Sequence, residues 1–144
     1  MRRVAVTFAL CGIAALALGA ARLARAADTT DPGFARVGAE MFQRYCASCH
    51  GTGAEGNGPV APVLKVPPAD LTRIAARRSG TFPDAEIARF IDGRFDVVAH
   101  GTREMPVWGL TFSQQDVTKG EDPDAVARGR IEALVEYLKT IQRN

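Results

Sequence analysis

The chain has 144 residues, of which 47% are hydrophobic and 24% are charged, and its formal net charge at pH 7 is +2. This length and composition are typical of one small globular domain and exclude a long disordered or multidomain chain. A nucleic-acid partner would need a clustered basic surface, and the near balance of 18 basic and 16 acidic side chains does not indicate one.

The first 26 residues have the organisation of a secretory signal. Met1-Arg2-Arg3 is a short basic start, residues 4–21 are almost uninterruptedly apolar, and Ala24-Arg25-Ala26 has the small-x-small form of a cleavage site. We therefore predict a signal peptide over 1–26, a single domain over 27–144, and export to the periplasm. The alternative is an uncleaved anchor, since the apolar run approaches the ~20 residues that span a bilayer; membrane association is expected only in that case.

Cleavage would reverse the sign of the net charge. The signal carries four arginines and no acidic residue, so residues 27–144 keep 14 basic and 16 acidic side chains, a net charge of −2. A domain of this size has a core of marginal volume, to which a bound cofactor would add apolar contacts.

The first predicted helix of the domain runs from Phe34 to Tyr45. Its apolar residues recur at helical spacing and form one stripe, composed of Phe34, Val37, Gly38, Met41, Phe42 and Tyr45. The helix leads directly into Cys46.

Cys46-Ala47-Ser48-Cys49-His50 follows, and C-x-x-C-H is the attachment motif of a c-type haem. Two thiols three positions apart lie on one side of a helical turn, where both can bond one porphyrin, and a neutral imidazole is a good iron ligand. A thioredoxin-like thiol pair would need neighbouring strands, and a zinc site would need about four ligands, here Cys46, Cys49, His50 and His100. Both alternatives are disfavoured beside an export signal.

The next segment contains a glycine-rich run and two short predicted helices. Residues 51–56 match G-x-G-x-x-G but follow no strand, so they indicate a loop that passes close to a cofactor rather than a phosphate site. Asp70 is expected to cap a helix over 71–78 that ends at Gly80, and a second helix is expected over 84–92, ending at Gly93. The arginines at 73, 77 and 78 form either a local basic patch or part of the solvated face of the predicted helix over 71–78.

Met105 is the best candidate for a second axial iron ligand. It lies in a predicted loop, 101–109, where Pro106 fixes the backbone and Trp108 supplies an apolar wall. A thioether suits haem iron, whereas a methionine can equally fill a gap in a core. His100 in the same loop is a rival ligand, and an open coordination position is the third alternative.

The last predicted helix starts at Asp122-Pro123, a capping residue followed by proline at the first helical position. Its apolar residues are Ile131, Leu134, Val135, Leu138 and Ile141. We expect it to cross the first helix at Gly38, against Leu134 or Tyr137. No alternating strand pattern of useful length is present, so the predicted fold class is all-α with four helices and long loops.

With these residues in place, the chain resembles the class I monohaem cytochromes c over essentially all of residues 27–144. The resemblance is carried by Gly38 and Phe42 before the C-x-x-C-H-Gly51 motif, by 67–71, by the Met105-Pro106-x-Trp108-Gly109 loop, and by Leu134 and Tyr137. It implies three to five helices wrapped around one covalent haem, with His50 proximal and Met105 distal. The mitochondrial members surround the haem with lysines, but this chain has only Lys65, Lys119 and Lys139.

The resemblance implies a periplasmic one-electron carrier with haem c and no catalysis of its own. Its expected partners are redox proteins, such as a periplasmic dehydrogenase, oxidase or reductase. An alternative is a cytochrome subunit bound tightly to a periplasmic dehydrogenase, for which Val107, Trp108 and Phe112 could supply an apolar docking patch if they are not in the core. Haem-based catalysis or gas sensing would require Met105 to be absent from the iron.

Overall fold

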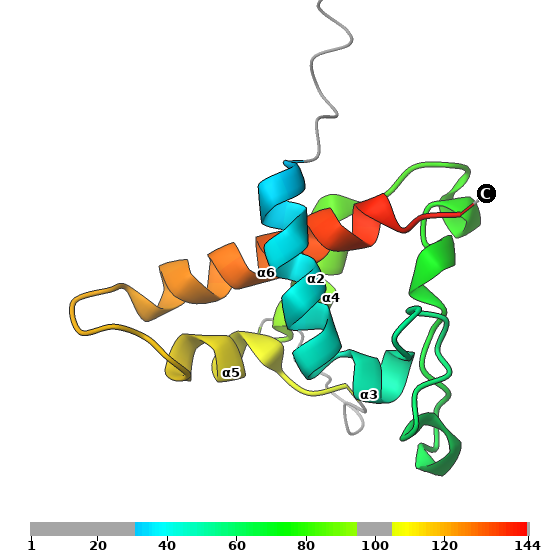
Figure 1. The fold of residues 1–144 in the computed structure, drawn as a ribbon, viewed down its shortest axis with the longest axis horizontal. Coiled ribbons are helices and arrows are strands. Elements are labelled where there is room, and N and C mark those ends of the chain that lie inside the picture. The colour runs from blue at the N-terminus through cyan, green and yellow to red at the C-terminus, as the bar shows by residue number, and fades with distance from the viewer. Residues whose placement is uncertain (1–30, 95–104, 144) are drawn as a thin grey trace, which may run out of the picture.

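Five α-helices and three 3₁₀ turns form the regular structure of the computed structural model, which describes residues 31–94 and 105–143 (Figure 1). The α-helices are α2 (Pro32–Tyr45), α3 (Ala47–His50), α4 (Asp84–Asp92), α5 (Trp108–Gln114) and α6 (Pro123–Thr140), and the 3₁₀ turns are η1 (Ala61–Val63), η2 (Leu71–Arg73) and η3 (Ala76–Arg78). These two ranges contain no strand, so the predicted all-α class is confirmed. The predicted signal peptide and His100 lie outside the described residues.

Helix α2 begins at Pro32, two residues before the predicted start at Phe34. Asp31 caps it by accepting hydrogen bonds from the backbone N–H groups of Gly33 at 2.8 Å and Phe34 at 3.2 Å. The predicted apolar stripe is shifted, because Val37 is 41% exposed while Ala35 is buried. The buried face is Ala35, Gly38 and Phe42, which are spaced at i, i+3 and i+7. Val37 therefore lies beside the contact with the rest of the protein, not within it.

Helices α2 and α6 cross each other at the centre of the molecule (Figure 1). A Cβ atom added at Gly38 would lie 1.9 Å from the carbonyl oxygen of Ala133 and 2.9 Å from the Cβ of Tyr137. The Phe42 and Tyr137 rings pack beside this point with centroids 5.3 Å apart. The predicted crossing at Gly38 is confirmed with Tyr137 as one partner, and the closest backbone belongs to Ala133 instead of Leu134.

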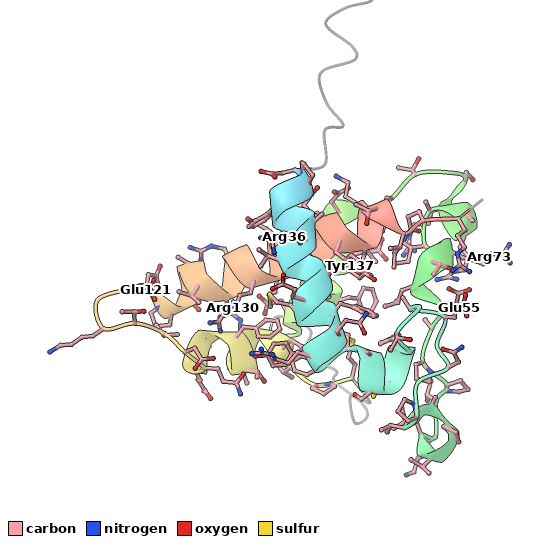
Figure 2. All side chains as sticks on the ribbon, in the orientation of Figure 1. Arg36, Glu55, Arg73, Glu121, Arg130 and Tyr137 are labelled. Atoms are coloured by element: carbon pink, nitrogen blue, oxygen red, sulfur yellow. The ribbon has the colours of Figure 1, made fainter. Side chains whose placement is uncertain are left out.

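Helix α5 was not expected, because residues 101–109 were predicted to be a loop. Trp108 opens α5, and Trp108 and Phe112, four residues apart, lie on one face with ring centroids 5.6 Å apart. The Arg130 guanidinium of α6 donates hydrogen bonds to the carbonyl oxygens of Phe112 at 3.1 Å and Gln115 at 2.7 Å, and so holds the end of α5 (Figure 2). A seven-residue helix is marginal in isolation, so α5 depends on this packing against α6.

The prediction for residues 71–78 was partly wrong. Asp70 caps the segment as expected, but η2 and η3 replace a continuous α-helix, and Ser79 takes the left-handed conformation before Gly80. The three arginines consequently share no helical face: Arg77 donates to the carbonyl of Asp70 and Arg78 pairs with Glu86. Helix α4 ends at Gly93 as predicted. Over the described ranges, no helix has the length and apolar character needed to cross a membrane.

Replacing Gly38 with alanine should destabilise the protein by at least about 2 kcal/mol, because the new methyl group meets rigid backbone of α6. Gly129→Ala is the matched control, since Gly129 lies inside α6 and its added Cβ meets nothing within 4 Å. That control should stabilise the protein by about 0.5–1 kcal/mol through helix propensity. Denaturant unfolding measures both; equal effects of the two substitutions would contradict the close crossing.

Candidate haem-attachment site

The C-x-x-C-H motif lies where helix α2 ends and the short helix α3 begins. The Cys46 N–H still donates to the carbonyl of Phe42 at 2.9 Å, and the Cys46 carbonyl accepts from the N–H groups of Cys49 at 3.2 Å and His50 at 2.9 Å. The backbone therefore keeps a helical path through the motif, with the two cysteines one turn apart. Both cysteine side chains are half-buried.

Burial shapes the chemistry of Cys46. It raises the pKa of the Cys46 thiol to about 12, and the neighbouring Cys49 adds a smaller upward electrostatic effect. The surroundings therefore favour an uncharged sulfur over a thiolate. A thioether has no charge to desolvate, so an uncharged, half-buried sulfur at this position fits covalent attachment of a porphyrin.

His50 is oriented by a residue from a distant loop. Its ring Nδ1 lies 3.0 Å from the carbonyl oxygen of Ala69. A carbonyl can only accept a hydrogen bond, so this contact requires Nδ1 to carry the proton. The other ring nitrogen, Nε2, then keeps its lone pair for a metal, and a second group holding the first nitrogen is the usual arrangement of a ligating histidine.

The glycine-rich run 51–58 turns the chain back over the motif. Gly51 and Gly56 have positive φ angles of 79° and 81°. The Gly56 N–H donates to the carbonyl of His50 at 2.8 Å, and the Gly58 N–H donates to that of Cys49 at 3.0 Å. A Cβ atom at Gly58 would lie 2.4 Å from the Ser48 carbonyl oxygen. The predicted loop is thus present, and its glycines let the backbone lie directly against α3.

A second backbone contact holds the segment that carries the Ala69 carbonyl. The Leu71 N–H donates to the carbonyl of the fully buried Ala54 at 2.8 Å. Asp70 accepts from the Thr72 N–H at 2.9 Å and the Thr72 hydroxyl at 2.6 Å. These hydrogen bonds, with a smaller contribution from nearby Arg77 and Arg143, lower the pKa of Asp70. The carboxylate form therefore favours the turn that follows Ala69.

Met105 is half-buried and packs against the main hydrophobic cluster. Three residues later Trp108 stacks on Phe112 and meets the edge of Tyr45, with ring centroids 5.7 Å apart for the second pair. Phe112 is fully buried and Trp108 is half-buried. These aromatic residues belong to the core, so they do not form the exposed docking patch considered from the sequence.

A buried ion pair that the sequence did not reveal supports the chain after Met105. The Arg94 guanidinium bonds both oxygens of Asp92, at 2.7 Å and 2.9 Å, and also pairs with Asp124. These carboxylates raise the pKa of Arg94. A Cβ atom on Gly109 would lie 2.3 Å from Asp92 Oδ1, so the start of α5 rests directly on this pair. Nothing in the sequence pattern distinguishes the charged residues at 92 and 94 from charged residues on the surface.

The zinc alternative considered from the sequence includes a residue that the structure does not describe. Across 31–94 and 105–143, no group of three or more histidine, cysteine, aspartate or glutamate side chains could hold a metal ion. The fourth ligand of the zinc alternative, His100, lies outside the described residues. Cys46, Cys49 and His50 follow one another along α3 and its N-cap, and two thiols next to an oriented imidazole are the groups that a covalent haem uses.

A helical domain with this motif at the end of its first helix defines a c-type cytochrome. A family model described as "Cytochrome C oxidase, cbb3-type, subunit III" matches residues 33–119, more than half of the chain. The chain therefore belongs to this family and carries a cytochrome c domain with covalently bound haem c. Comparisons with curated proteins and with solved structures gave no match.

Asp70→Ala should lower the free energy of unfolding at pH 7 by ~1 kcal/mol, because it removes a capping carboxylate. The folded-state pKa of Asp70 lies below the usual 3.8, so its contribution is present above about pH 4 and is lost as the pH falls through the folded pKa. Urea unfolding at pH 7 and at pH 3 should therefore show the difference between the two proteins shrinking in acid. A difference that stays constant or grows would contradict the charged cap.

Proposed function

We propose that this protein is a periplasmic one-electron carrier, with haem bonded to Cys46 and Cys49 and iron bound by His50 and Met105. The haem supplies the one-electron couple. The chain attaches it through two half-buried thiols, orients one ligand through Ala69, and places Met105 against the apolar core. Two axial ligands leave no open position, which favours electron transfer over oxygen or peroxide chemistry.

The observation that carries this proposal is the contact between His50 Nδ1 and the Ala69 carbonyl. It selects the tautomer that can bind iron, and it does so directly beside the two thiols. Membership of the cytochrome family supports the same conclusion, since residues 33–119 include the thiols, His50 and Met105. The predicted signal peptide over 1–26 supports export to the periplasm. The exported protein would then be the domain over 27–144, with the haem attached to it covalently.

The second candidate function is that of a stable cytochrome subunit in an oxidoreductase complex, for example one bound tightly to a periplasmic dehydrogenase. The family description names an oxidase subunit, which favours association with a larger redox complex. The loop around η1 exposes Val60, Val63 and Val66, with Val63 exposed by 81%. Exposed apolar side chains grouped in one loop are compatible with a lasting interface as well as with a transient one.

The optical spectrum of the purified protein tests the axial ligands. The oxidised protein should show a weak far-red band from sulfur bound to iron, and Met105→Ala should abolish that band and lower the reduction potential, because a thioether favours reduced iron. Met41→Ala is the matched control, since Met41 is also half-buried against the core and should leave the band in place. A band that survives in Met105→Ala would show that a different sulfur binds the iron. Absence of the band from the unaltered protein would instead indicate His100 or an open position as the alternative.

Gentle purification from the periplasm tests location and association together. The mass should equal residues 27–144 plus one haem, because the signal is cleaved after Ala26 and both thioether bonds form. Elution as a single small protein would support the carrier, and co-elution with a dehydrogenase or oxidase would support the subunit. Recovery only with membranes, with the full-length mass, would show that the N-terminal segment remains as an anchor.

A further inference from the structure

The C-terminal end of α6 returns to the segment that orients His50. In Figure 1 the end of the chain lies beside the segment between α3 and α4, on the side of the molecule opposite to the start of α6. Gln142 lies two residues beyond the last helical residue, Thr140, and it is half-buried. Contacts between this tail and residues 71–75 span about seventy positions of the sequence.

Every hydrogen-bonding group of the Gln142 amide has a backbone partner. Its Nε2 donates to the carbonyl of Leu71 at 2.8 Å and to that of Leu138 at 2.7 Å. Its Oε1 accepts from the Ala75 N–H at 2.9 Å. One side chain therefore fixes both ends of the 71–75 segment to the end of α6, with a geometry that only an amide provides.

The neighbouring residue adds two further bonds. The Arg143 N–H donates to the carbonyl of Thr72 at 2.7 Å. The Arg143 guanidinium pairs with Glu55 at 2.6 Å, and Figure 2 labels Glu55 on the same side of the molecule as the end of the chain. The tail thus contacts residues 71–75 and also the glycine-rich run that covers α3.

The segment carrying the Ala69 carbonyl is held between these two sets of contacts. On one side Leu71 bonds Ala54, and the Pro68 carbonyl oxygen lies so near Gly56 that a Cβ there would be 2.4 Å away. On the other side Gln142 bonds the carbonyl of Leu71, only two residues after Ala69. A shift of Leu71 would move the carbonyl that the His50 ring contacts.

We propose that Gln142 is a positioning residue for the proximal ligand: by fixing residues 71–75 to the end of α6, it holds the Ala69 carbonyl on His50 Nδ1 and so tunes the iron site. This inference rests on the proposed role of His50 as an iron ligand, and it is independent of whether Met105 is the other ligand. The hydrogen bond to a carbonyl makes an imidazole a stronger electron donor, which favours oxidised iron.

Gln142→Met tests the proposal, because methionine has a similar length and volume but makes none of the three hydrogen bonds. Thr140→Val is the matched control: it removes a 2.7 Å hydrogen bond from the same end of α6, between the Thr140 hydroxyl and the Tyr137 carbonyl, without touching 69–75. Both variants are studied as haem-loaded protein. The readouts are the reduction potential and the hydrogen-exchange rate of the His50 ring N–H in the reduced state.

In Gln142→Met we expect a higher reduction potential and His50 ring exchange faster by about fivefold or more, which corresponds to loss of roughly one net hydrogen bond. Thr140→Val should leave both readouts unchanged. A third variant, Gln142→Glu, keeps the acceptor for Ala75 and loses both donors to Leu71 and Leu138, so its His50 ring exchange should be faster than in the unaltered protein, as in Gln142→Met. Only the exchange rate is compared for this variant, because its added carboxylate charge itself lowers the reduction potential.

Readouts in Gln142→Met that match Thr140→Val, even with lowered stability, would overturn the positioning role and leave the ligand assignment intact. A far-red band that survives in Met105→Ala would overturn the assignment of Met105 as an iron ligand. The comparison of Gln142→Met with Thr140→Val would remain valid. An unaltered protein whose spectrum shows no histidine on the iron would overturn the proposed ligation and this proposal with it.

Discussion

The close crossing of α2 and α6 is the constraint on which the rest of the structure depends. Gly38 allows the α2 backbone to approach Ala133 at a distance that no larger residue permits. The crossing fixes the direction of α2, and the last residue of α2 is followed at once by Cys46. Packing between two helices that are distant in the sequence therefore decides where the haem-attachment motif lies relative to the hydrophobic core.

Long irregular segments then build the site around that fixed point, using backbone groups more than side chains. The run after His50 returns over α3 because its glycines tolerate positive φ angles and close approach. Ala69 contributes only its carbonyl, and Ala54 contributes only its own carbonyl to Leu71. A ligand oriented through backbone atoms depends on how firmly that backbone is held, which is why the contacts of Gln142 matter for the iron site.

The segments that carry Ala69 and Met105 are supported in different ways. The Ala69 segment is held by hydrogen bonds of backbone groups with the Gln142 amide and with the Asp70 carboxylate, and the C-terminal tail adds the Arg143–Glu55 ion pair. The segment of Met105 continues into α5, which rests on the Asp92–Arg94 pair and on the stacked rings of Trp108 and Phe112. The Asp92 and Arg94 side chains are only 11% and 17% exposed, so breaking their pair would leave a poorly solvated charge beneath the start of α5.

The sequence alone determined the class of the protein, because the information lies in local patterns. Cys46, Cys49 and His50 are close in the chain, and so are the predicted caps Asp70 and Asp122 and the N–H groups from which they accept hydrogen bonds. Periodicity located α2 and α6, the residues at its two ends located α4, and Gly38 predicted the crossing of α2 and α6. Met105, although plausible as a ligand from its loop chemistry, remains a prediction.

The tertiary structure decided the features that depend on contacts between residues far apart in the chain. Helix α5 forms because Arg130 and the aromatic cluster hold seven residues that are too few to form a stable helix alone. Residues 71–78 form two 3₁₀ turns rather than one α-helix, with Leu71, Thr72 and Ala75 bonded to Ala54 or to the C-terminal tail. The partner of His50 is a carbonyl, and every residue except proline carries the same backbone groups, so no residue type could have revealed Ala69.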